Sequence, residues 1–105
     1  MRKAITKAGL AAICMCFLAT ELSAAPIIAN ACLQSNRKAA TGTLCRCIQK
    51  VADQSLRGGD QRRVASFFRN PDKAQEVFMS KKSADDAFWL RYKAFASQAE
   101  QSCGG

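Results

Sequence analysis

Residues 44–57 read LCRCIQKVADQSLR, and this stretch decides how the rest of the chain can fold. At the turn of about 100° per residue in an α-helix, its apolar side chains fall on one broad arc. These apolar positions are Leu44, Cys47, Ile48, Val51, Ala52 and Leu56. Arg46, Lys50 and Arg57 lie on the opposite face, with Asp53 among them. The stretch therefore predicts an amphipathic central helix, which Thr43 can cap.

Two cysteines of this helix, Cys45 and Cys47, point to different neighbours. Two residues turn a helix by about 200°, so their side chains diverge and cannot bond each other. Cys32 and Cys103 are the partners that the rest of the chain supplies. Two pairings remain open: Cys32–Cys45 with Cys47–Cys103, or Cys32–Cys47 with Cys45–Cys103. Either pairing ties an N-terminal segment and the C-terminus onto the central helix.

A different role for the cysteines is a thiolate pair. Cys45 and Cys47, helped by Met79, would suit a soft metal such as Cu(I), and a redox motif is a related alternative. Structural disulfides are the favoured interpretation, because small exported domains use them to support a limited core. We therefore predict two disulfides, no metal and no cofactor.

The N-terminus has the order of a secretory signal peptide. Residues 1–7 carry three basic side chains, residues 8–19 are uncharged, and small residues follow up to Ala25. The uncharged run of 12 residues spans about 18 Å as a helix, well short of a bilayer core of about 30 Å. We expect cleavage after Ala24, with Ala25 and Ala31 as the other positions, and no permanent membrane span in the mature chain.

The length, charge and cysteine number of the folded part follow once residues 1–24 are left out. The whole chain has 105 residues, 16 Lys+Arg, 8 Asp+Glu, six Cys and a net charge of +8. Without residues 1–24, which carry three bases, one acid and two cysteines, 81 residues remain with a net charge of +6. That length holds one domain, residues 25–105, and the cysteines place it in an exported compartment, the bacterial periplasm.

Other helices follow from start and stop signals along the chain. Apolar spacing predicts a short helix over residues 27–36. Gly58 and Gly59 end the central helix, and Asp60 caps the next one. Asn70-Pro71 starts a fourth helix, and a capping box at Ser83 starts a last one that runs to about Ser102. The predicted fold class is all-α, a small bundle of four to five short helices stapled by two disulfides.

Aromatic residues of these helices predict the core. We expect it to contain Phe67, Phe68, Phe78, Phe88, Tyr92 and Phe95. Trp89, Tyr92 and Phe95 have an alternative role, the lining of an apolar pocket or of a cation-binding aromatic cage. Aromatic residues at helical spacing more often form a core, so the core interpretation is favoured.

Charge is the feature that indicates a partner. A candidate basic surface consists of Arg46, Lys50, Arg57, Arg62 and Arg63. Such a surface can bind an envelope protein or an anionic surface, and export disfavours nucleic acid. A solvated surface without a partner is the plainer alternative. The chain has no His, the usual general base, so we predict a binding module and no enzyme or catalytic residue.

Several blocks of the chain resemble a family of short exported bacterial proteins, some of them described as arginine transporters. The resemblance covers residues 32–103 and rests on CRCIQ at 45–49, VADQ at 51–54, DQRR at 60–63, AQEV at 74–77 and FW at 88–89. It implies an accessory role in arginine uptake. One apolar segment of 12 residues cannot form a transport path, so that role would be the soluble binding of arginine by a carboxylate. The candidate acids are Asp53, Asp60, Glu76, Asp85 and Asp86.

Overall fold

A computed structural model describes residues 25–104, which form five α-helices and no strand. The helices are α1 (Ile27–Leu33), α2 (Gly42–Ser55), α3 (Gly58–Arg69), α4 (Asp72–Met79) and α5 (Ser83–Cys103). Two disulfides link them. The prediction of an all-α bundle of short helices with two disulfides is confirmed.

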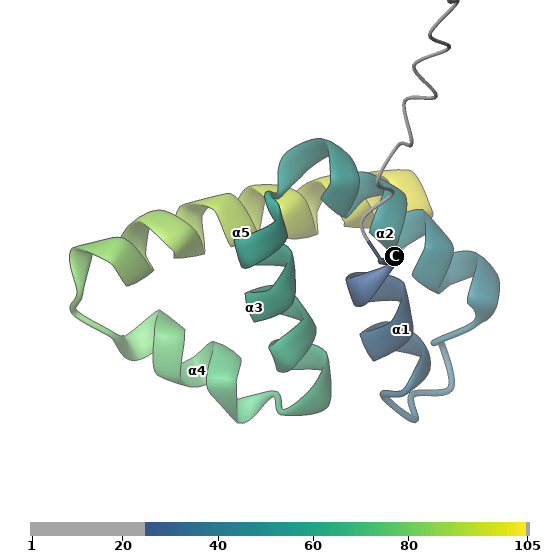
Figure 1. Cartoon of the computed structure of the whole chain (residues 1–105), viewed down its shortest axis with the longest axis horizontal. Coiled ribbons are helices and arrows are strands. Elements are labelled where there is room, and N and C mark those ends of the chain that lie inside the picture. Colours follow the sequence, from purple (N-terminus) through teal and green to yellow (C-terminus); the bar gives the residue numbers. More distant parts are fainter. Residues whose placement is uncertain (1–24, 105) are drawn as a thin grey trace, which may run out of the picture.

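Helix α2 is the middle element of the fold, as its two cysteines predict. It packs against α1 and against α5, while α1 also packs against α3, and α4 packs against α3 and α5. Helix α5 is the longest, with 21 residues, and runs along one side of the other four helices (Figure 1). We call α1, α2 and α3 the N-terminal half and α4 and α5 the C-terminal half, which is attached to the first through the packing of α5 on α2 and of α4 on α3.

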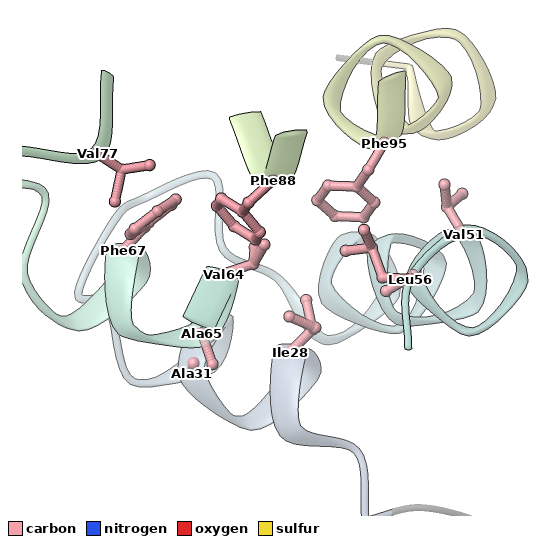
Figure 2. Close-up of a cluster of buried hydrophobic side chains, with 11 residues drawn as sticks. Ile28, Ala31, Val51, Leu56, Val64, Ala65, Phe67, Val77, Phe88 and Phe95 are labelled. Carbon is pink, nitrogen blue, oxygen red and sulfur yellow. The ribbon is translucent and has the colours of Figure 1, made fainter. Parts of the chain in front are cut away.

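The core extends through both halves (Figure 2). Ile28 of α1, Val64 of α3 and Phe88 of α5 are almost completely buried. Phe67 of α3 meets the rings of Phe88 and Tyr92 edge-on, with centroids 5.9 and 5.2 Å apart. Helices α3 and α5 therefore meet through aromatic side chains, an arrangement favourable for aromatic rings.

The predicted aromatic core is correct except at Phe78. Phe67, Phe88 and Phe95 are buried, whereas Phe68 and Tyr92 are half-buried against the core. Phe78 is 59% exposed. Helix α4 has only eight residues, and its buried position is taken by Val77. Phe78 is rotated from it by about 100° and lies instead against Trp89, with ring centroids 5.3 Å apart.

Two predicted boundaries of α2 are wrong by about half a turn. Thr41, rather than Thr43, caps the helix, because its hydroxyl accepts a hydrogen bond from the Leu44 N–H at 3.1 Å. At the other end α2 stops at Ser55, where Leu56 becomes extended and turns into the core. Gly58 then begins α3 instead of ending α2. Burial of Leu56 therefore takes the place of the glycine stop.

Of the remaining predicted helix starts, one is correct in part and two are wrong. Asn70 accepts a hydrogen bond from the Asp72 N–H at 3.1 Å, as a capping residue does, but the helix begins at Asp72, so Pro71 precedes it instead of being its first residue. Asp60 lies inside the first turn of α3 rather than at its cap, and no side chain caps α5 at Ser83. Asp85, in the first turn of α5, is instead bound to Arg63 of α3. A tertiary ion pair thus replaces the local capping box.

Candidate functional site

The first of the two open pairings is the one that forms. Cys32 bonds Cys45 with an S–S distance of 2.06 Å, and Cys47 bonds Cys103 with an S–S distance of 2.12 Å. Cys45 faces α1 and Cys47 faces α5, so the two bonds leave α2 on different sides. All four cysteines of residues 25–104 are used in these bonds, so Cys45 and Cys47 form no thiolate pair in this oxidised state. The disulfide prediction is confirmed.

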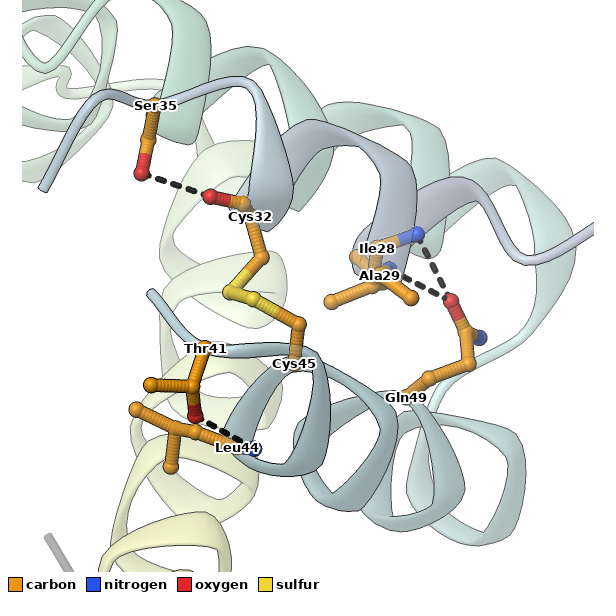
Figure 3. The surroundings of a disulfide bond; sticks show 8 residues. All are labelled: Ile28, Ala29, Cys32, Ser35, Thr41, Leu44, Cys45 and Gln49. Carbon is orange, nitrogen blue, oxygen red and sulfur yellow. Dashed lines mark hydrogen bonds between the residues drawn. A yellow bond between two sulfur atoms is a disulfide. The ribbon is translucent and has the colours of Figure 1, made fainter. Parts of the chain in front are cut away.

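The two bonds differ in environment. The Cys32–Cys45 bond is buried, and the Ser35 hydroxyl donates to the Cys32 carbonyl at 2.7 Å (Figure 3). The Cys47–Cys103 bond is half-buried and joins the start of α2 to the last residue of α5. The first bond is therefore part of the core, while the second closes the edge of the bundle.

A buried polar network joins the first three helices, and sequence reasoning missed it. The Gln49 side chain of α2 accepts hydrogen bonds from the N–H groups of Ile28 and Ala29 at 2.8 and 2.9 Å (Figure 3). Its amide nitrogen donates to Asp53 at 2.8 Å and to Gln61 at 2.9 Å. Gln49 thus caps α1 from a neighbouring helix, satisfying N–H groups that a helix start otherwise leaves unpaired.

Gln61 of α3 completes this network. Its amide donates to Asp53 at 3.1 Å and to the Leu56 carbonyl at 3.2 Å. No buried side-chain nitrogen or oxygen of residues 25–104 lacks a hydrogen-bond partner. Gln49 and Gln61 belong to the CRCIQ and DQRR blocks on which the family resemblance rests. Both glutamines therefore hold helices together. Asp53, a candidate acid for arginine binding, is bound within the same network.

The five predicted basic residues do not form one equivalent set. Arg46, Lys50, Arg57 and Arg62 are exposed. Arg63 is half-buried, makes an ion pair with Asp85, and holds its guanidinium carbon 4.6 Å from the centroid of the Phe88 ring. Arg63 therefore fastens α3 to α5 and contributes less charge to the surface than its sequence position indicates.

Two candidate acids are likewise occupied by arginines of the chain itself. Asp60 accepts hydrogen bonds from Arg91 at 2.7 and 3.1 Å, and this contact holds the pKa of the Asp60 carboxyl below its ordinary value. The pKa of Asp85 is lowered first by a hydrogen bond with Ser80 and then by one with Arg63. Glu76 and Asp86 are exposed and outside the ion pairs of residues 25–104. The carboxylates named from sequence do not converge on one site.

The described chain has an apolar cavity of about 490 Å³. Helices α2, α3 and α5 supply most of its walls, and Arg37 of the chain between α1 and α2, Pro71 and Ala74 of α4 complete them. The apolar lining includes Leu44, Ile48, Phe67, Phe68, Phe95, Ala96 and Ala99. Arg37 and Glu100 are its charged lining residues. We name this feature the apolar cavity.

Part of the predicted aromatic pocket belongs to the apolar cavity. Tyr92 and Phe95 line it, whereas Trp89 lies against Phe78 and Tyr92 outside it. Burial raises the pKa of the Tyr92 phenol, which therefore stays protonated at neutral pH and able to donate a hydrogen bond. Sequence periodicity identifies these residues as inward-facing. It does not show that the helices leave a space beside them.

Comparisons of the chain with protein families, with curated proteins and with solved structures find no match in any of the three. None of the helices within residues 25–104 has both the length and the apolar character required to span a bilayer. The candidate functional site of this chain therefore rests on its own geometry, which singles out the apolar cavity.

Proposed function

We propose that the chain is an exported binding module and that its binding site is the apolar cavity. One observation supports this most strongly: a small chain of 105 residues keeps about 490 Å³ open beside its core. Cavities of about 300–1,000 Å³ with mainly apolar walls and few polar groups are typical of small-molecule sites. The lining has this character, since Arg37 and Glu100 are its charged members.

An open apolar lining is unfavourable unless it is used. Protein interiors are normally close-packed, and apolar surface left in water forfeits about 25 cal/mol per Å². Two features keep the cavity open. The Cys47–Cys103 bond fixes the end of α5 on α2, and the ring of Phe67 between α3 and α5 keeps those helices apart. The separation between α3 and α5 is therefore a property of the fold itself.

Export is part of this proposal. Disulfides persist mainly in oxidising compartments, and two of them join the helices. The charge pattern of residues 1–24, which lie outside the described residues, is typical of a signal peptide. We infer that the mature chain acts in the periplasm, by binding rather than by catalysis.

The binding proposal is tested with an apolar dye and a filled cavity. N-phenylnaphthylamine should bind the purified oxidised protein in a one-to-one complex with increased fluorescence. Ala96→Phe places a ring inside the apolar cavity and should abolish binding, whereas Ala94→Phe, on the exposed face of α5, should not. Equal dye affinity in the two variants would overturn the proposal. If Ala96→Phe loses its urea transition, Ala99→Met fills the same cavity with a smaller side chain.

The exposed basic residues support a second candidate, contact with an anionic surface. Arg46 and Lys50 lie at helical spacing on α2, Arg57 lies between α2 and α3, and Arg62 follows on α3, all of them exposed. Vesicles containing anionic lipid should then retain the protein at low salt and release it as salt is added. Replacing Arg46 and Lys50 together by Gln should weaken retention. Retention that is insensitive to salt would contradict this candidate.

A further inference from the structure

Arg37, in the loop after α1, has no acidic partner within residues 25–104, and it lies at the edge of the apolar cavity. Arg63 is paired with Asp85 and Arg91 with Asp60, whereas no ion pair or side-chain hydrogen bond of residues 25–104 involves Arg37. Its guanidinium carbon lies 5.9 Å from the centroid of the Phe68 ring, and both residues line the apolar cavity. The cavity thus has an unpaired guanidinium, with its N–H donors free, at its edge.

Tyr92 adds a second donor to the same cavity. Its ring is half-buried in the lining, and its hydroxyl takes part in none of the side-chain hydrogen bonds of residues 25–104. Both Arg37 and Tyr92 line the cavity, and the positive charge of Arg37 partly offsets the effect of burial, which raises the pKa of this phenol. A guanidinium and a phenol O–H beside an apolar space are the donors that a carboxylate would use.

Glu100 is the other charged residue in the lining of the apolar cavity. It makes no ion pair with Arg37. It lies on α5 eight residues beyond Tyr92, a distance of about 12 Å along the helix axis. An acid group held beside Tyr92 therefore lies away from the Glu100 carboxylate. The net charge of the described domain also favours an anion.

We propose that the ligand of the apolar cavity is an amphipathic carboxylate of the fatty-acid type, with its acid group held by Arg37 and the Tyr92 hydroxyl and its hydrocarbon body among the apolar walls. This inference rests on the proposed function, because it assigns a ligand class to the same cavity. The walls supply affinity through apolar burial, and the two donors select the acid.

The test compares dodecanoate with dodecanol by titration calorimetry, below the concentration at which either one aggregates. At the roughly 30 Å³ that a water molecule occupies in the liquid, the heavy atoms of a twelve-carbon chain come close to filling the cavity. Hydrogen bonds to a charged group predict that the wild-type protein binds the acid about tenfold to a hundredfold more tightly than the alcohol. Arg37→Gln should remove most of this preference, because the acid loses a charged hydrogen-bond donor and its affinity falls more than that of dodecanol.

Matched variants separate this donor from general charge. Lys38→Gln removes the same charge from the neighbouring exposed residue, which does not line the cavity, and should keep the preference for the acid. Tyr92→Phe should reduce it while keeping the ring. A preference that survives Arg37→Gln, or falls equally in Lys38→Gln, would overturn the assignment to Arg37.

Further outcomes keep the two proposals apart. Equal binding of acid and alcohol, both blocked by Ala96→Phe, would refute the carboxylate ligand and leave the binding cavity standing. Failure of both compounds and of the dye to bind would refute the cavity itself. Binding of arginine that is lost in Glu100→Gln and kept in Arg37→Gln would also overturn the proposal, in favour of a cationic ligand.

Discussion

Different contacts hold the helices of the N-terminal half and those of the C-terminal half in place. In the N-terminal half a buried disulfide and the Gln49 network hold α1, α2 and α3 in close contact, with every buried side-chain polar group of residues 25–104 satisfied. In the C-terminal half α5 packs on α2, where a half-buried disulfide attaches its end, and aromatic rings and ion pairs join it to α3. Aromatic side chains hold α3 and α5 further apart than small side chains would. The apolar cavity lies beside this contact, where the space between the helices is not filled.

The largest expected effect comes from the aromatic contacts of the C-terminal half. Phe88→Ala removes a ring that is 1% exposed and should lower the free energy of unfolding by about 3–5 kcal/mol. Phe78→Ala is the matched control, since that ring is 59% exposed, and should cost under about 1 kcal/mol. Urea unfolding of both variants measures the difference. Equal losses would show that Phe78 belongs to the core after all.

The two disulfides should contribute unequally. The Cys47–Cys103 bond spans 56 residues and the Cys32–Cys45 bond spans 13. Loop-closure entropy then predicts losses of about 4 and about 3 kcal/mol when each pair is replaced by Ala. Denaturant unfolding of the two double variants checks this order. The reverse order would show that burial of the Cys32–Cys45 bond, rather than loop length, decides its contribution.

A smaller effect is expected from the polar network of the N-terminal half. Gln49→Met keeps the length of the side chain but leaves the N–H groups of Ile28 and Ala29 unpaired. The free energy of unfolding should fall by about 2–3 kcal/mol. Gln54→Met, an exposed change on the same helix, should stay within about 0.5 kcal/mol of wild type. Faster amide hydrogen exchange in α1 of the Gln49 variant alone would locate the loss, and unchanged exchange would contradict the capping role.

The smallest expected effect is the pH dependence of the Asp60–Arg91 pair. The hydrogen bond from Arg91 lowers the folded-state pKa of Asp60, so the pair stabilises the fold fully above the ordinary aspartate pKa of about 3.9. That contribution is lost as the pH falls below it, through the lower pKa of the folded state. Asp60→Asn should therefore destabilise the protein at pH 6 more than at pH 3. An equal loss at both pH values would exclude the linkage.

Local signals predicted parts of both halves. The periodicity of residues 44–57 placed Cys45 and Cys47 on different sides of one helix, and the structure has them there. The same reasoning put Phe78 in the core, because apolar spacing shows which face of α4 is apolar but not whether eight residues have enough neighbours to cover it. Gln49 carried no recognisable cap signal, since the helix that it caps lies 20 residues or more away in sequence.

Sequence alone determined the helices and the set of cysteines that join them, because helical periodicity and disulfide chemistry depend on neighbouring residues and on cysteine number. Only the tertiary structure decided between the two disulfide pairings. It also paired Arg63 with Asp85 and placed Arg37 and Tyr92 beside one cavity. These outcomes depend on which faces of separate helices meet and at what distance. That distance is fixed by the size of the side chains between the helices, and no single stretch of sequence contains it.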